Sequence, residues 1–232
     1  MDNNSIQKAE ELIGYHFVDD KHLRTALTHS SYANERKINK VQDYERYEFL
    51  GDAILEMVSS EYLFLKYPQL KEGELTRLRA SMVCEVALAF CAKELGISSC
   101  IFLGKGEEET GGRNRASVTS DVMEAIIGAI FLDGGLSPAK SFIMNHVLND
   151  LDDKQLFYDS KSLLQEEIQK HPGWILQYEV IAEEGPEHNK MFTTQILING
   201  VKRAEGCGHN KKAAEQEAAY KVLLELKGSK GK

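Results

Sequence analysis

The sequence predicts a two-domain protein, in which an all-α N-terminal domain precedes a small α+β domain with the element order αβββα. Through residues 6–150, apolar residues recur at helical spacing, and no convincing alternation of polar and apolar residues interrupts them. Alternation begins after residue 173, and the dipeptide Asn199-Gly200 between two alternating stretches is typical of a tight hairpin. The predicted boundaries are 1–151 for the first domain, 152–160 for a polar linker and 161–228 for the second domain.

Glycines and a proline divide the first domain into a series of predicted helices. The helices cover residues 5–14, 22–28, 43–67, 74–95, 121–132 and 138–151. They begin or end at Gly73, Gly96, the Gly134-Gly135 pair and Pro138, as helix boundaries should. The glycine-rich, charged stretch 104–119 is predicted to be a long loop, and loops of that length in a compact domain are usually functional or mobile.

The second domain carries its own start and stop signals. Ser162 and Gln165 have the spacing of a capping box, which predicts a helix that ends at His171-Pro172-Gly173. The predicted strands cover 174–182, 190–198 and 201–205. A last helix over 211–226 places Ala214, Ala218, Val222 and Leu226 on one face.

Composition excludes several classes of protein. With 42% hydrophobic residues, 28% charged residues and 4 prolines, the chain is neither collagen-like nor disordered. The longest apolar runs, 86–92 and 125–132, are far shorter than the roughly 20 residues of a membrane span, and the charged N-terminus shows no secretory signal. The four cysteines lack CxxC pairing, so buried free thiols are expected rather than a zinc site or disulfides. Together these features predict a cytoplasmic protein with no membrane partner.

The negative charge lies entirely in the first part of the chain. Residues 161–232 hold 11 Lys and Arg against 10 Asp and Glu, a net of +1, and the remaining 17 against 26 give residues 1–160 a net of −9. An acidic balance usually argues against nucleic-acid partners. A role on nucleic acid therefore requires a local constellation and something that neutralises its carboxylates.

Five carboxylates form two candidate groups. Glu45, Glu48 and Asp52 stand within about 60° of one another on one helix face, with no basic residue at i+4 to compensate them. Asp121 and Glu124 stand at i, i+3 at the start of an apolar helix, and Gly128 permits another helix to approach. Carboxylates from two packed helices are typical of oxygen-ligand sites for a hard divalent cation. The alternatives are a solvated acidic face for the first group and a helix-dipole partner for Asp121.

These residues carry a resemblance to a known family. The segment 45–55, ERYEFLGDAIL, is very similar to the signature of the ribonuclease III family. Segments 26–32, 104–113 and 121–135 also resemble that family, and residues 161–226 resemble a double-stranded-RNA-binding domain that closes with KKAAEQEAA. The chain is identified as similar to the bacterial enzymes, in which an all-α endonuclease domain precedes the RNA-binding domain.

The resemblance implies a homodimeric endoribonuclease that uses Mg²⁺, with Mn²⁺ able to substitute, and cuts double-stranded RNA. The products would carry 5′-phosphate and 3′-hydroxyl ends with short 3′ overhangs, and the substrates would include ribosomal RNA precursors and structured transcripts. By position, Glu48, Asp52, Asp121 and Glu124 match the metal ligands, and Asp52 and Glu124 match the catalytic pair. Glu45 and Glu74 match accessory acidic positions, although an exposed glutamate in a helix's first turn needs no function. Phe49 either faces the dimer partner, as in the family, or is buried within the chain.

The second domain has three candidate RNA contacts. Lys211 and Lys212 lie at a predicted helix N-terminus, where the dipole disfavours cations, so a phosphate-binding end is predicted over a simple role in solubility. Asn210 permits N-capping there. By resemblance, Gln165 and Glu166, and Pro186 and His188, match positions that touch the minor groove of duplex RNA; the alternative for His188 is an ordinary loop histidine.

Two other functions remain compatible with the residues. One is a regulator that binds duplex RNA without cutting it, although the four carboxylates are all present. The other is an acidic helical scaffold whose C-terminal module docks a protein, in which case binding would not depend on salt.

Overall fold

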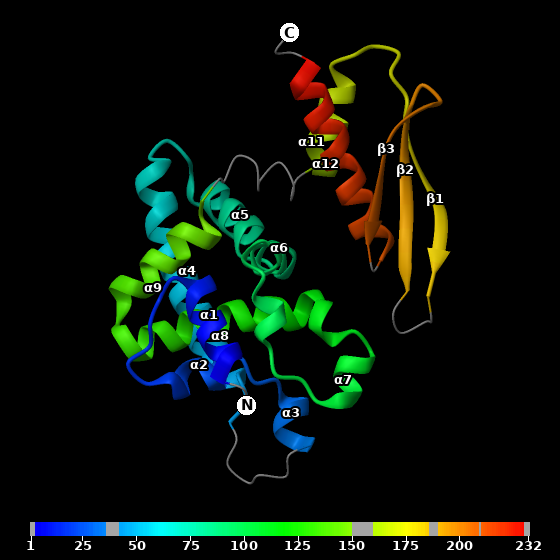
Figure 1. Ribbon diagram of the computed structural model, residues 1–232. Coiled ribbons are helices and arrows are strands. Elements are labelled where there is room, and N and C mark those ends of the chain that lie inside the picture. The colour runs from blue at the N-terminus through cyan, green and yellow to red at the C-terminus, as the bar shows by residue number, and fades with distance from the viewer. Residues whose placement is uncertain (1–2, 36–41, 150–159, 186–189, 209, 230–232) are drawn as a thin grey trace. The chain divides into compact units, whose positions relative to one another are not determined.

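The computed structural model describes residues 3–35, 42–149, 160–185, 190–208 and 210–229 (Figure 1). The chain divides into two compact units, Met1–Asn149 and Asp150–Lys232. The predicted linker lies outside the described residues, except for Ser160, which is the first residue of a helix. Among the described helices, none is long and apolar enough to cross a membrane.

The first unit is helical, as predicted. Its elements are α1 (Asn3–Ile13), α2 (Asp20–Ala26), α3 (Ser30–Glu35), α4 (Glu45–Lys66), α5 (Glu72–Met82), α6 (Glu85–Leu95), η1 (Ile97–Cys100), α7 (Lys105–Glu109), η2 (Gly112–Asn114), α8 (Ala116–Gly134), α9 (Leu136–Phe142) and the π-helical turn η3 (Ile143–Val147). A parallel β-bridge between Thr28 and Phe102 joins the segment after α2 to the segment after η1.

Helix α8 is the centre of the first unit. Its sequence is apolar on all sides, which is typical of a helix that other helices surround. Helices α2, α4, α6 and α9 pack against it, and the side chains of Val122, Ala125, Ile126, Ile127 and Ile130 are fully buried. The core of the unit therefore lies along α8, and residues on α8 that face α4 lie deep in the fold.

Three predicted boundaries in the first unit are wrong. The predicted helix 74–95 is two helices, because Cys84 is extended and starts α6 anew. Neither glycine nor proline marks this break; α5 packs on α4 and α6 packs on α8, so tertiary packing sets it. The predicted loop 104–119 contains α7, η2 and the first turn of α8. Helix α8 thus begins at Ala116, and Asp121 is not in its first turn, which removes the helix-dipole alternative.

The second unit has the predicted order αβββα. Its elements are α11 (Ser160–Gln169), β1 (Leu176–Glu184), β2 (Met191–Ile198), β3 (Val201–Gly208) and α12 (Lys211–Ser229). The sheet is antiparallel in the order β1-β2-β3, and α11 and α12 pack together, with α12 against β2 and β3. The buried core contains Leu164, Ile168, Ile196, Ala218 and Val222, in agreement with the predicted apolar face of the last helix.

In the second unit, the structure confirms the predicted hairpin turn but not the predicted start of the first helix. Asn199 and Gly200 both have positive φ, 54° and 75°, as a type I′ turn requires. The predicted capping box is wrong, because α11 begins at Ser160 and Ser162 lies inside the helix. Instead, the Ser160 hydroxyl is buried and donates to the carbonyl of Gln216 on α12 (2.8 Å).

The cysteines only partly match the prediction. All four are free thiols, as expected. Cys91 and Cys100 are buried, whereas Cys84 and Cys207 are exposed. Cys84 is exposed because the helix breaks there, so the apolar pattern that predicted its burial does not continue through it.

Candidate active site

Two glycines let α4 and α8 cross at close range. A Cβ built on Gly51 would lie 1.8 Å from the carbonyl oxygen of Glu124, and one on Gly128 would lie 2.3 Å from the carbonyl oxygen of Tyr47. The two backbones are therefore in direct contact. Because Gly51 adjoins Asp52 and follows Glu48 by three residues, the crossing brings the carboxylates of α4 against those of α8. The approach expected at Gly128 is confirmed, and Gly51 is its counterpart.

Four of the carboxylates at this crossing act on one another electrostatically. Burial, together with the charges of Asp52, Glu48 and Asp121, raises the pKa of Glu124 to about 8. Burial also raises the pKa of Glu48 to about 6, with contributions from Asp121, Glu45 and Asp52. Within the described residues, none of these four forms an ion pair with Lys, Arg or His. The site is an uncompensated, half-buried anionic cluster.

The remaining acidic candidates differ in position. Asp52 and Glu45 are exposed, so the cluster opens to solvent on the α4 side, and Glu45 is close enough to act on Glu48. Glu74 is not brought into the cluster. Its carboxylate accepts the backbone N–H of Lys71 (2.9 Å) and caps the start of α5, which is the structural role open to a first-turn glutamate.

Two aromatic residues at the site were missed by sequence reasoning. Tyr44 is buried and its hydroxyl donates to Asp121 Oδ2 (3.3 Å), while the ring of His29 packs edge-on against it, with ring centroids 5.7 Å apart. Burial raises the pKa of Asp121, whereas the hydrogen bonds from Tyr44 and Ser120 and the charge of His29 oppose this rise. Tyr44 precedes the signature by one residue, and His29 falls in segment 26–32, so position beside a motif was the available signal.

The cluster fits a divalent cation by its donor chemistry. Four carboxylates supply hard oxygen ligands, and their mutual repulsion is what such a cation relieves. As the side chains stand, no three His, Cys, Asp or Glu side chains in the described ranges form a group that could already hold a metal ion. Loading the site therefore requires side-chain rotations about a backbone crossing that is already in place.

The raised pKa values predict how metal-free stability depends on pH. Because the pKa of folded Glu124, about 8, lies above its ordinary value of 4.5, the folded state holds a proton that the unfolded state releases. The stability this contributes is complete below pH 4.5 and is lost as the pH rises through 8. In EDTA, we expect Glu124→Gln to melt at a higher temperature than the parent protein at pH 8.5, with little difference at pH 4.5. Equal melting temperatures at both pH values, measured by calorimetry, would contradict the burial of this charge.

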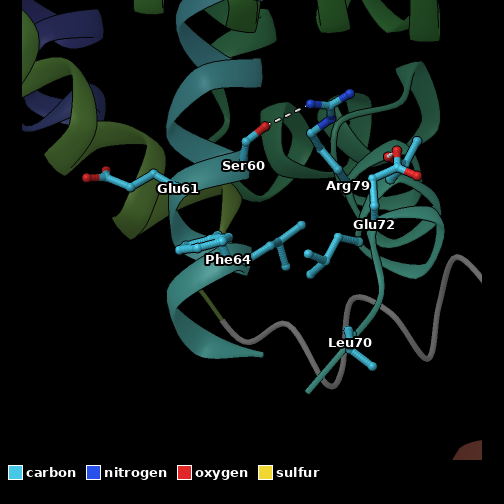
Figure 2. A pocket seen from close by; sticks show the side chains of 9 residues that line it. Ser60, Glu61, Phe64, Leu70, Glu72 and Arg79 are labelled. Carbon is cyan, nitrogen blue, oxygen red and sulfur yellow. Dashed lines mark hydrogen bonds between the residues drawn. The ribbon is translucent and has the colours of Figure 1, made fainter. Parts of the chain in front are cut away.

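The groove between α4 and α5 is a different place from the cluster. Figure 2 shows Ser60, Phe64, Leu70 and Arg79 around it, and the Arg79 guanidinium donates to the Ser60 hydroxyl (2.8 Å). Arg79 also pairs with Glu56 (2.9 Å). None of the four clustered carboxylates lines this groove.

Phe49 is exposed, at 80% of its full area, so the alternative of a buried intramolecular position is wrong. Phe49 lines a pocket together with Arg46, Leu50 and Leu132. Leu132 is itself 49% exposed. An apolar surface of this kind lies on α4 and α8, the two helices that carry the carboxylates.

Four of the RNA-contact candidates of the second unit lie on two described helices. Gln165 and Glu166 are exposed on α11, and Lys211 and Lys212 are exposed in the first turn of α12. The N-cap that Asn210 permits is formed, because its side-chain oxygen accepts the backbone N–H of Ala213 (2.8 Å). Pro186 and His188 lie outside the described residues.

Comparisons with known proteins agree for both units. Residues 19–151 match the family model described as Ribonuclease-III-like, and residues 160–226 match the double-stranded RNA binding motif. Proteins named Ribonuclease 3 from Bacillus cereus (strain AH187) and Bacillus anthracis (strain CDC 684) are each 46% identical over 220 residues, 94% of this chain and 90% of theirs. The solved nuclease domain of ribonuclease III from Campylobacter jejuni is 41% identical with a TM-score of 0.57, covering 61% of this chain and 95% of that one.

Fold, carboxylate cluster and C-terminal module together define a class of protein: a helical nuclease domain joined to a double-stranded-RNA-binding domain. The similarity extends over nearly the whole chain and over both units. The chain belongs to the ribonuclease III family. Membership of this family also indicates a divalent metal requirement.

Proposed function

We propose that the protein is a Mg²⁺-dependent endoribonuclease that cuts both strands of duplex RNA. The observation that carries this proposal is the anionic cluster at the crossing of α4 and α8, in a chain that also has a double-stranded-RNA-binding domain. Products would carry 5′-phosphate and 3′-hydroxyl ends with short 3′ overhangs. The proposed setting is the cytoplasm, with ribosomal RNA precursors and structured transcripts as substrates and Mn²⁺ as a substitute metal.

The four clustered carboxylates would have two roles, metal binding and catalysis. Glu48, Asp52, Asp121 and Glu124 would hold the ion, and Asp52 and Glu124 are proposed as the catalytic pair. When bound, a divalent ion supplies activation of water and stabilisation of the leaving 3′ oxygen. Half-burial keeps the carboxylates of Glu48 and Glu124 poorly hydrated, so they favour a cation over water. Glu45 and Glu74 are proposed as accessory acidic residues only.

The metal also resolves the conflict between an acidic domain and a polyanionic substrate. Residues 1–160 carry a net charge of −9 by sequence, and the cluster alone contributes four negative charges when ionised. An ion in the cluster inverts the local field that a phosphate meets. The second domain, with its net of +1, supplies the remaining attraction through a small number of lysines.

At the start of α12, the two lysines differ in what surrounds them. Lys211 Nζ lies 3.3 Å from Glu183 Oε1 and over the Phe192 ring, whereas Lys212 forms no ion pair within the described residues. We therefore expect Lys212→Ala to weaken duplex-RNA binding and to reduce the slope of log affinity against log salt by about 1. Lys93→Ala, which removes an exposed lysine of α6, is the charge-matched control. An unchanged salt slope in Lys212→Ala would exclude this lysine as a phosphate contact.

A homodimer is part of the proposal. It is supported by exposed apolar side chains of the first unit, among them Phe49, Phe64 and Leu132. The Campylobacter jejuni structure concerns a region involved in dimer formation, which makes the same assembly a natural expectation for this chain. In a dimer, these side chains would be buried against the second copy. Their apolar surface would then no longer be exposed to water, which is unfavourable in free energy.

Competition between nucleic acids tests the proposed substrate class. Labelled duplex RNA is incubated with the protein and Mg²⁺ in the presence of unlabelled duplex RNA, single-stranded RNA or duplex DNA of the same sequence. Duplex RNA alone should suppress cleavage of the label at low excess, because such domains recognise the 2′-hydroxyls and groove shape of A-form RNA. Equal suppression by duplex DNA would contradict the assignment.

A further inference from the structure

Tyr44 is fixed in place by both of its backbone groups. Its N–H donates to the carbonyl of Thr28 (2.9 Å), and its carbonyl accepts the N–H groups of Tyr47 (2.8 Å) and Glu48 (2.9 Å). The residue is 5% exposed and stands immediately before α4. Tyr44 therefore helps to fix the position of the Glu48 backbone in the first turn of α4, and its own backbone hydrogen bonds fix the position of its ring.

The Tyr44 hydroxyl reaches across to the other helix of the crossing. It donates to Asp121 Oδ2 over 3.3 Å. Ser120 Oγ also lies 3.3 Å from Asp121 Oδ1, but it has one hydrogen and a closer acceptor in the carbonyl of Ser117 (2.9 Å). Among the described contacts, the Tyr44 hydroxyl has Asp121 as its acceptor and no closer competitor.

Segments 26–32 and 104–113, which contribute none of the clustered carboxylates, hold the Tyr44 ring in place. The ring packs against the His29 ring, and the backbone N–H of His29 donates to the carbonyl of Phe102 (3.1 Å). His29 Nδ1 accepts the N–H of Ser31 (3.1 Å), and Ser31 Oγ accepts the N–H of Gly104 (3.0 Å). Segments 26–32 and 104–113 thus meet at Ser31, which is hydrogen-bonded to His29, and His29 packs on the ring of the tyrosine that contacts Asp121.

We propose that Tyr44 is a positioning residue for the metal site, which holds the Asp121 carboxylate by one oxygen and leaves the other available to the ion. A hydrogen bond from a neutral donor orients a ligating carboxylate and reduces the rotational freedom that binding must remove. His29, Ser31 and Gly104 keep the ring from moving away. The inference rests on the proposed function, because it assumes that Asp121 is a ligand.

The test compares two tyrosines that are three residues apart. Tyr44→Phe removes the hydroxyl on Asp121 and keeps the buried ring. Tyr47→Phe is the matched control, since its hydroxyl lies 3.0 Å from His22 Nδ1 and has no described contact with the carboxylates. Mg²⁺ is titrated without RNA, and the thermal unfolding midpoint is followed. We expect Tyr44→Phe to require about 10-fold more Mg²⁺ for the half-maximal rise, and Tyr47→Phe to match the parent protein.

A double variant separates positioning from general loosening of the fold. If Tyr44 acts through Asp121, Tyr44→Phe should change the Mg²⁺ midpoint little further in an Asp121→Asn background. A normal Mg²⁺ midpoint in Tyr44→Phe, or an equal loss with and without Asp121, would overturn the inference while leaving the proposed function intact. A parent protein whose unfolding does not respond to Mg²⁺ or Mn²⁺ would instead contradict the metal site itself, and the inference with it.

Discussion

Glu124→Gln is expected to lower the rate of duplex-RNA cleavage by about 1,000-fold or more without weakening RNA binding. The substitution replaces the most strongly perturbed carboxylate of the cluster, which would be ionised when it binds the ion, by a neutral amide. The RNA-binding domain lies elsewhere in the sequence and keeps all its lysines, so affinity for the duplex should not fall. Single-turnover cleavage and a native-gel titration of the same preparation measure the two properties.

A charge-matched control makes the Glu124 result specific. Glu94→Gln removes an exposed glutamate of α6 and should cleave at the parent rate. Near-normal turnover in Glu124→Gln would remove this residue from the chemistry. Parallel loss of binding and cleavage would mean that the cluster contributes to RNA affinity rather than to the reaction.

Gly51→Ala is expected to disrupt both the fold and the candidate active site. The added methyl group would lie 1.8 Å from a backbone oxygen of α8, which a side-chain rotation cannot relieve, so the two helices must separate. Overpacking of this kind costs about 3 kcal/mol or more, which lowers the melting temperature of a domain of this size by roughly 10 °C. Cleavage should be lost even at temperatures where the variant is folded, because Asp52 and Glu124 move apart together with the helices.

Gly73→Ala is the control for Gly51→Ala. Gly73 lies in the first turn of α5, and a Cβ built there meets no atom within 4 Å. Alanine is the better helix former, so this variant should be as stable as the parent protein or slightly more so. Similar melting temperatures for the two variants would contradict the close helix crossing on which the site is built.

Sequence reasoning located the carboxylates because their signals are local. Glu45, Glu48 and Asp52 share a face by helical periodicity, and Gly128 indicated a close approach without its partner. That Gly51 is the partner depends on how α4 packs against α8, which no spacing along the chain contains. The hairpin at Asn199-Gly200 was predictable for the same reason as the carboxylates, since positive φ is a property of those two residues.

The features that were missed depend on tertiary contacts. The break between α5 and α6 at Cys84 has no glycine or proline to mark it, since it arises where two helices follow different neighbours. Tyr44 and His29 were overlooked because an aromatic residue beside a motif usually belongs to the core. The role proposed for Tyr44 rests on the contact of its hydroxyl with Asp121 Oδ2 (3.3 Å), which joins residues 77 positions apart in the sequence.

Metal-switched cleavage of one defined substrate tests the central claim most directly. An end-labelled RNA duplex of about 30 base pairs is incubated with the purified protein in Mg²⁺, in Ca²⁺ and in EDTA, and each reaction is divided between a native gel and product-end analysis. Cleavage in Mg²⁺ and not in EDTA, with 5′-phosphate ends and short 3′ overhangs, is the result we predict. Binding of the duplex without cleavage under every condition would contradict it and would favour a regulator that holds duplex RNA intact.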